Sequence, residues 1–116
     1  MDRQLKALEQ KIIDFRDRRD WAPFHSPKNL SQALGIEAAE LQEIFLWQTC
    51  EASRIPSAAD RDRAASEIAD IFIYLTYLSR ELDVDLFQAV EKKLIENERK
   101  YPVDKAKGNS QKYNQL

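Results

Sequence analysis

The chain has 116 residues, of which 43% are apolar and 33% are charged, and this length suits one globular domain, residues 1–116. The formal net charge of −2, with both signs interspersed, leaves no basic surface for a nucleic acid polymer. No apolar run reaches the roughly 18 to 20 residues that span a bilayer, and the N-terminus "MDRQLKALEQ" is charged where a signal peptide is apolar. We therefore expect a cytoplasmic protein that binds no membrane.

The first half of the chain predicts two helices separated by a loop. Apolar side chains recur at spacings of three and four over residues 3–19, which indicates an amphipathic helix. The following segment "DWAPFHSPKN" contains two prolines and is expected to be a loop. A second helix is expected from Leu30 to Thr49, with Asn29 as its N-cap.

The second half predicts two further helices and a tail. The third helix, residues 60–82, contains "IADIFIYLTYL", which is apolar nearly all round, and a chain this small seldom covers such a helix alone. We therefore expect this helix to contact another subunit. The fourth helix starts at the candidate N-cap Asp85 and ends at Lys100, before a flexible polar tail at 103–116. The predicted fold is all-α, resembling a four-helix bundle, and assembled as an oligomer.

Two pairs of acids, each pair three residues apart, intrude on apolar helix faces. Glu37 lies in the middle of such a stripe with Glu40 at its edge, and Glu67 and Asp70 repeat the spacing on the third helix. If these faces pack together, four carboxylates converge and repel one another unless a cation joins them. An all-oxygen set favours Mg²⁺ or Mn²⁺. Glu43 lies further round the helix. It either supports the metal site from behind the ligands or faces solvent, and the sequence favours neither alternative.

A polar row marks the apolar side of the fourth helix. Lys93, Asn97 and Lys100 follow the i, i+4, i+7 pattern there. Lysine stems can simply pack along such a face with their ammonium groups in water. Opposite a carboxylate-bound metal, however, the row suits the phosphates and sugar of a nucleotide.

Aromatic side chains precede and follow the second helix. Trp21 and His25 lie in the predicted loop, and Trp47 is expected about two turns after Glu40 on nearly the same side. Flat side chains near a metal and lysines can sandwich a nucleobase. A core position for each Trp, and a hydrogen bond within the loop for His25, are the alternatives.

Four stretches together carry a family likeness: "FRDRRDWAPFHSPKNLSQALGIEAAELQEIFLW", "EIADIFIYLTYLSRELDVDL", "KLIENERKYPV" and "KGNSQKY". In this combination the chain resembles the all-α nucleoside triphosphate pyrophosphohydrolases of the MazG-like superfamily, and within it the dCTP pyrophosphatase group. The resemblance implies a helical bundle that forms a dimer or homotetramer, a Mg²⁺ site, and hydrolysis of a nucleoside triphosphate to the monophosphate and pyrophosphate.

The resemblance also implies roles for individual residues. The implied metal ligands are Glu37, Glu40, Glu67 and Asp70. The implied contacts with base and sugar are Trp21, His25, Trp47 and Tyr74. The implied remaining nucleotide contacts are Lys93, Asn97, Lys100 and Tyr101.

The residue types present favour direct attack by water on the α-phosphorus, because the chain has neither a Ser–His–Asp set nor an expected nucleophilic cysteine. Metal coordination lowers the pKa of that water, and Glu40 or Glu43 is the candidate base. Lys93 and Lys100 would stabilise the departing pyrophosphate. On resemblance, we expect dCTP or 5-modified dCTP as substrate, in cleansing of the nucleotide pool.

Three alternatives differ in what they explain. A MazG-like enzyme with another nucleotide substrate would share every feature above. A helical protein-interaction adaptor without catalysis would explain the apolar third helix but not acids and lysines on inward faces. A di-iron or di-manganese bundle typically has a His three residues after a Glu, whereas the only histidine here lies in the predicted loop.

Overall fold

A computed structural model describes residues 3–116 as helices joined by short connections. No strand occurs in this range, so the prediction of an all-α fold is confirmed. Within residues 3–116, no helix combines the length and the apolar character of a membrane-spanning segment. Main-chain contacts divide the chain into two compact units, one ending at Val84 and the other running from Asp85 to Leu116. That the whole chain forms one domain stays a prediction.

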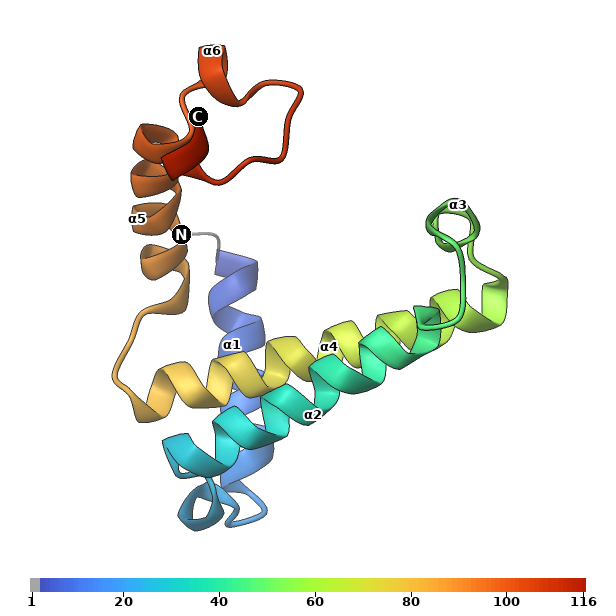
Figure 1. The fold of residues 1–116 in the computed structure, drawn as a ribbon. Coiled ribbons are helices and arrows are strands. Elements are labelled where there is room, and N and C mark those ends of the chain that lie inside the picture. The colour runs from blue at the N-terminus through green and yellow to red at the C-terminus, as the bar shows by residue number, and fades with distance from the viewer. Residues whose placement is uncertain (1–2) are drawn as a thin grey trace. The chain divides into compact units, whose positions relative to one another are not determined.

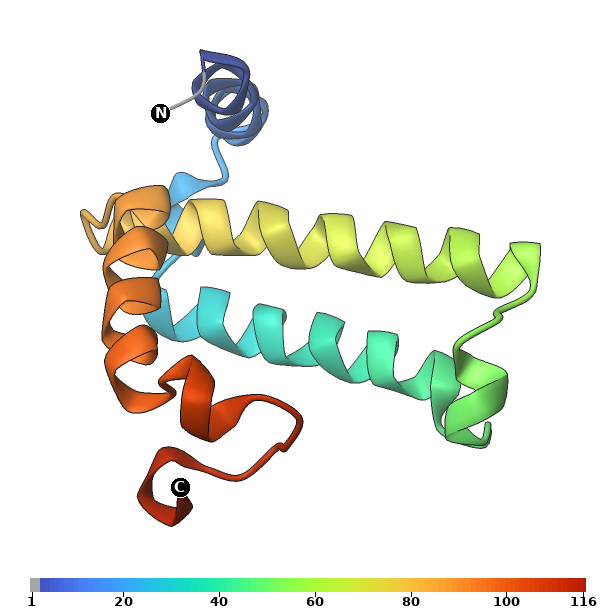
Figure 2. The same ribbon diagram turned by 90° about the horizontal axis from the view of Figure 1, so that it is seen from above.

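The first unit is built on three long helices, α1 (Arg3–Asp17), α2 (Pro27–Phe45) and α4 (Ala58–Glu81). α2 and α4 run antiparallel and pack against each other along much of their length (Figures 1 and 2). α1 packs on α4. Both polar and apolar side chains that α2 and α4 turn toward each other therefore come into contact.

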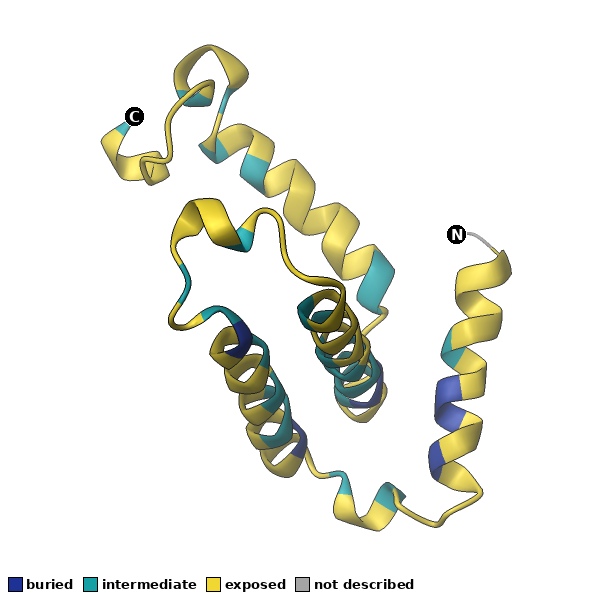
Figure 3. Ribbon diagram, turned by 90° about the vertical axis from the view of Figure 1, so that its right-hand side faces the viewer, coloured by how far each residue is buried: buried dark blue, intermediate teal, exposed yellow. Residues whose placement is uncertain are grey.

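A small apolar core joins these helices. Ile12 and Ile13 of α1 are buried together with Leu30 of α2 and Tyr77 of α4. Figure 3 shows in dark blue that few positions are buried and that most of the surface of the helices is exposed. Ile13 and Leu30 are the largest fully buried side chains of the described residues. The core therefore fixes α1 and the start of α2 against the C-terminal half of α4.

The second helix begins earlier than the sequence predicts, so the prediction of Asn29 as its N-cap is wrong. Ser26 is the N-cap, and its Oγ accepts a hydrogen bond from the Asn29 backbone N–H at 3.1 Å. Pro27 occupies the first turn, where its fixed φ suits a helix and its missing N–H costs nothing. Two prolines predicted a loop here, but the second of them starts the helix.

The second helix also ends earlier, at Phe45 and not at Thr49. Thr49 begins another helix, because its Oγ1 accepts the Ala52 N–H and caps the short α3 (Cys50–Ser53). Trp47 consequently lies in the turn that follows α2, not on its surface.

The second unit consists of α5 (Leu86–Lys100), the short α6 (Val103–Ala106) and a 3₁₀-helix (Tyr113–Gln115). Asp85 caps α5 by accepting the Gln88 N–H at 3.1 Å, so the predicted start of this helix is confirmed. Within the segment predicted as a polar tail, the Tyr113 ring packs edge-on to that of Tyr101 at 6.2 Å.

Candidate active site

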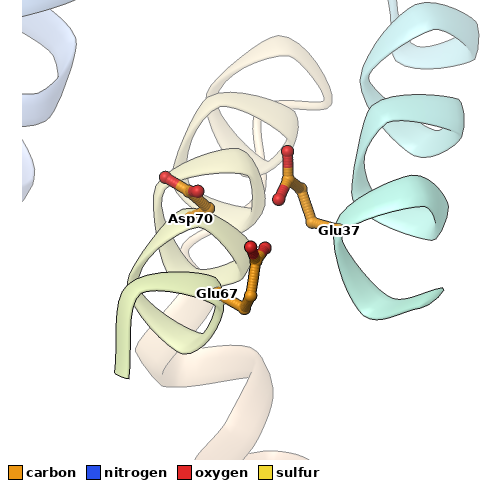
Figure 4. A group of neighbouring side chains, drawn as sticks. All are labelled: Glu37, Glu67 and Asp70. Atoms are coloured by element: carbon orange, nitrogen blue, oxygen red, sulfur yellow. The ribbon is translucent and has the colours of Figure 1, made fainter. Parts of the chain in front are cut away.

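Three carboxylates converge between α2 and α4. Glu37 reaches from α2 toward α4, where Glu67 and Asp70 lie one turn apart (Figure 4). One oxygen of each carboxylate lies within 4.8 Å of the corresponding oxygens of the other two, and all three residues are half-buried. The spacing of three on α4 places both of its acids on the side that faces α2. We call these three residues the carboxylate cluster.

The close approach of these acids is unfavourable when all of them are ionised. Oε2 of Glu37 and Oε2 of Glu67 are buried, and neither has a hydrogen-bond partner among the described residues. A hydrogen bond to Glu67, burial, and the negative charge of Glu40 raise the pKa of Glu37 from 4.5 to about 7. Two ionised carboxylates have no donor between them, so this hydrogen bond forms only when one of the two side chains carries a proton. Near neutral pH, the cluster therefore favours binding of a proton or of a cation.

A divalent cation fits this donor set. The cluster offers only carboxylate oxygens, and two of its buried oxygens have no hydrogen-bond partner among residues 3–116. A bound metal ion would supply the missing partner. Oxygen-only ligands are preferred by hard ions such as Mg²⁺ and Mn²⁺. The arrangement therefore agrees with the metal site predicted from the spacing of the acids.

Glu40 lies outside the carboxylate cluster. It is exposed, and with Glu43 and Glu67 it lines a cavity of about 370 Å³ between α2 and α4. Its charge nevertheless raises the pKa of Glu37, so it acts on the cluster electrostatically. That Glu40 is a fourth metal ligand stays a prediction. It also stays a prediction that Glu40 or Glu43 is the general base.

A larger cavity of about 460 Å³ opens on the carboxylate cluster, and we call it the aromatic cavity. Its volume is within the range of small-molecule sites. Glu37 and Asp70 form part of its wall, together with three predicted residues, Trp21, His25 and Tyr74. The wall also contains residues that the sequence did not single out: Lys11, Ile12, Phe15, Ile73 and Tyr77.

His25 packs inside the aromatic cavity. Its ring centre lies 4.8 Å from that of Tyr77 and 6.5 Å from that of Trp21. Its Nδ1 is buried and has no hydrogen-bond partner within the described part of the chain. Burial and the positive charge of Arg16 lower the pKa of His25 below its usual 6.5. At neutral pH the imidazole is therefore uncharged and offers one donor and one acceptor.

Arg16 supports this wall and was missed in the sequence. It is buried, and its Nη1 donates to Oε1 of Glu81 at 2.8 Å, which ties α1 to the end of α4. Its guanidinium carbon lies 5.8 Å from the centre of the Tyr77 ring. The available signal was its position four residues after Ile12, on the apolar side of α1.

Comparison with known proteins decides the family. The model of the MazG-like family matches residues 33–116, which include the whole carboxylate cluster. The chain belongs to the MazG-like family. The resemblance noted in the sequence is thereby confirmed.

Individual MazG-like relatives extend the match over nearly the whole chain. dCTP pyrophosphatase 1 of Bos taurus is 43% identical over 114 residues, which cover 97% of this chain and 68% of the relative. dCTP pyrophosphatase 1 of Homo sapiens is 41% identical, with 97% and 67% covered. Among solved structures, a pyrophosphatase from Archaeoglobus fulgidus matches with a TM-score of 0.74 and 34% identity, covering 88% of this chain and 95% of that one.

Not every residue implied by the MazG-like resemblance joins the aromatic cavity. Trp47 is 93% exposed in the turn after α2 and is not part of the cavity wall. Its contact with a substrate stays a prediction.

The predicted basic row belongs to the second unit. On α5, Nζ of Lys93 and Nζ of Lys100 lie 3.3 and 3.0 Å from Oε1 of Glu96, an acid that the sequence reasoning left out. Asn97 is half-buried on the same helix, and Tyr101 is its C-cap. Contact of these four predicted residues with a nucleotide stays a prediction.

Proposed function

We propose that the chain hydrolyses dCTP, or dCTP substituted at the 5-position of the base, to the monophosphate and pyrophosphate, with Mg²⁺ as its cofactor. The observation that carries the proposal is the carboxylate cluster at the wall of an aromatic cavity in a MazG-like chain. The family and its relatives make the chain a nucleoside triphosphate pyrophosphohydrolase. The base, the ion and the roles of single residues are the proposal.

The aromatic cavity supports a pyrimidine nucleotide. Stacking on an indole such as Trp21 contributes about 1 to 3 kcal/mol per base and depends little on which base is present. Selection therefore needs polar groups, and the uncharged His25 in the cavity wall can pair with the edge of a base. The side chains of Phe15 and Ile73 add an apolar wall that tolerates a methyl group at the 5-position.

The reaction needs few groups from the chain. The carboxylate cluster would hold a divalent cation, which when bound polarises phosphate oxygens and lowers the pKa of a water molecule. Glu40 or Glu43 takes the proton as water attacks the α-phosphorus, and the bond to the bridging oxygen of the leaving pyrophosphate breaks. Lys93 and Lys100 neutralise charge on that leaving group, while Asn97 and Tyr101 complete the contacts. Mn²⁺ can replace Mg²⁺ because both prefer oxygen ligands.

We also propose that the chain acts as a homo-oligomer, a dimer or a tetramer. Large apolar side chains remain exposed in the single chain, among them Ile68 of α4 at 57% and Leu8 of α1 at 46%. Burying them against another subunit is favourable by about 25 cal/mol per Å². A role in cleansing the nucleotide pool of the cytoplasm is part of the same proposal.

A substrate panel tests the proposed function. The purified protein is incubated with Mg²⁺ and with dCTP, 5-methyl-dCTP, dTTP, dATP or dGTP, and the products are separated by anion-exchange chromatography. We expect the highest kcat/KM for dCTP and its 5-methyl derivative, and dCMP or its 5-methyl form plus pyrophosphate as products. Asp70→Asn should lower turnover by at least about a hundredfold. A preference for dATP, or release of orthophosphate from dCTP, would overturn the proposal.

A further inference from the structure

We propose that the 370 Å³ cavity binds the pyrophosphate half of the substrate as its magnesium complex, and that Arg63, which lines this cavity, is a cationic contact in addition to Lys93 and Lys100. We call this cavity the second cavity. The inference rests on the proposed function, because it assigns the phosphates that the reaction removes. It adds a substrate-binding residue that neither the sequence motifs nor the family assignment singled out.

The carboxylate cluster lies between the two cavities. Glu37 and Asp70 belong to the wall of the aromatic cavity, whereas Glu67 belongs to the wall of the second cavity. One carboxylate oxygen from each of these three residues lies within 4.8 Å of those from the other two. A phosphate held at the cluster therefore has an opening on each side.

The order of residues along α4 gives the substrate a direction. Arg63, Glu67, Asp70 and Tyr74 are spaced by four, three and four, so they follow one side of the helix. Arg63 precedes Glu67 by four residues, which is about 6 Å along the helix axis, and Tyr74 follows on the other side of the cluster. A nucleotide with its base beside Tyr74 and its α-phosphate at the cluster directs its remaining phosphates toward Arg63.

The two cavities differ in chemistry as the two halves of a nucleotide do. Five aromatic side chains, counting His25, line the aromatic cavity, which suits a base. None of the described residues that line the second cavity is aromatic; they are Glu40, Glu43, Ile44, Arg63, Ser66 and Glu67. Its three acids repel bare pyrophosphate, so the cavity suits a complex in which Mg²⁺ neutralises part of the phosphate charge.

Arg63 is free to turn toward a phosphate. Its side chain is 64% exposed, and its Nη1 lies 3.5 Å from Oδ1 of Asp60, at the long limit of a hydrogen bond. A planar guanidinium can donate two parallel hydrogen bonds to phosphate oxygens. The hydroxyl of Ser66, on the same wall, can donate a further one. These contacts would stabilise the negative charge that the bridging oxygen carries when the bond to the α-phosphorus breaks.

Calorimetric titration with the two halves of the substrate tests the inference. The probes are magnesium pyrophosphate and dCMP, and the proteins are the wild type, Arg63→Gln, Arg61→Gln and Trp21→Ala. Arg61 is a matched control, because it is an exposed arginine of α4 that lines neither cavity. We expect Arg63→Gln to weaken the binding of magnesium pyrophosphate by about tenfold and to leave the binding of dCMP unchanged. The reason is that the substitution removes charged hydrogen bonds to the pyrophosphate half only. Trp21→Ala should weaken the binding of dCMP and leave that of magnesium pyrophosphate unchanged. Arg61→Gln should bind both probes as the wild type does.

The outcomes separate this inference from the proposed function. The role of Arg63 would be overturned if Arg63→Gln bound magnesium pyrophosphate as tightly as the wild type does, or if its affinity fell equally for both probes. Failure of the wild type to bind magnesium pyrophosphate while it hydrolyses dCTP would overturn the second cavity as a site and leave the proposed function intact. Selective loss of pyrophosphate binding in a protein that hydrolyses no triphosphate would support the site and overturn the proposed function.

Discussion

Glu37→Gln removes a charge from the carboxylate cluster at nearly constant size, and we expect it to stabilise the metal-free protein. The pKa of Glu37 is about 7 in the folded chain, against 4.5 for the free side chain. A difference of this size corresponds to roughly 3 kcal/mol of unfavourable free energy when Glu37 is ionised. Partial exposure of the side chain screens the repulsion, so we expect a gain of about 1 to 2 kcal/mol in the free energy of unfolding. The new amide can also donate to Glu67, which an ionised Glu37 cannot.

The direction of the pH dependence follows from the same values. The folded chain binds the Glu37 proton more tightly than the unfolded chain, so the wild type loses stability as the pH rises from about 4.5 to about 7. The amide of Gln carries no such proton. The advantage of Glu37→Gln is therefore complete above pH 7, decreases as the pH falls, and disappears below about 4.5.

Urea denaturation in the presence of a chelator measures this difference. The wild type and Glu37→Gln are compared at pH 8 and pH 4.5, with Glu91→Gln, an exposed glutamate of α5, as the control for the same chemical change. Addition of Mg²⁺ should then raise the midpoint of the wild type more than that of Glu37→Gln, because a ligand of the ion is missing. A Glu37→Gln protein that is less stable than the wild type at pH 8 without metal would refute repulsion within the cluster.

Three further predictions concern the pocket, its support and the assembly. His25→Ala should narrow the difference in kcat/KM between dCTP and dTTP, because it removes the uncharged imidazole proposed to hydrogen-bond the edge of the base. An unchanged ratio of kcat/KM for the two nucleotides would exclude that role. Arg16→Met should lower the free energy of unfolding by about 1 to 3 kcal/mol in urea denaturation, because it leaves the partly buried Glu81 without its partner at 2.8 Å; wild-type stability would contradict a structural ion pair. Analytical ultracentrifugation at micromolar concentration should show a dimer or tetramer, whereas a stable monomer would contradict oligomerisation.

The helices were predictable because their signals are local. Apolar spacing located all of the long helices, and Asp85 caps α5 as its position suggested. The errors arose where two local signals compete. Ser26, followed by Pro27, is the N-cap of α2 in place of Asn29. Thr49 caps a new helix, α3, at a point where the spacing of apolar residues predicted that the second helix continues. In both cases a side-chain oxygen accepts a backbone N–H, and the periodicity of apolar residues does not register such a hydrogen bond.

The candidate site was predictable only in part. The spacing of three puts Glu67 and Asp70 on one side of a helix whatever the fold, and an acid within an apolar stripe such as Glu37 signals a partner across the interface. The contributions of α1, including Lys11 and Arg16, depend on how that helix packs on α4, which no local pattern records. The same holds for the stacking of His25 on Tyr77.

The most direct test of the central claim, that water attacks the α-phosphorus of dCTP, is hydrolysis in water enriched in heavy oxygen, followed by mass spectrometry of both products. The carboxylate cluster, with the candidate general bases Glu40 and Glu43 on the wall of the neighbouring cavity, supports attack at the phosphorus next to the sugar. We therefore predict one heavy oxygen atom in dCMP and none in pyrophosphate. Heavy oxygen in pyrophosphate, with unlabelled dCMP, would mean attack at the β-phosphorus and would contradict the account.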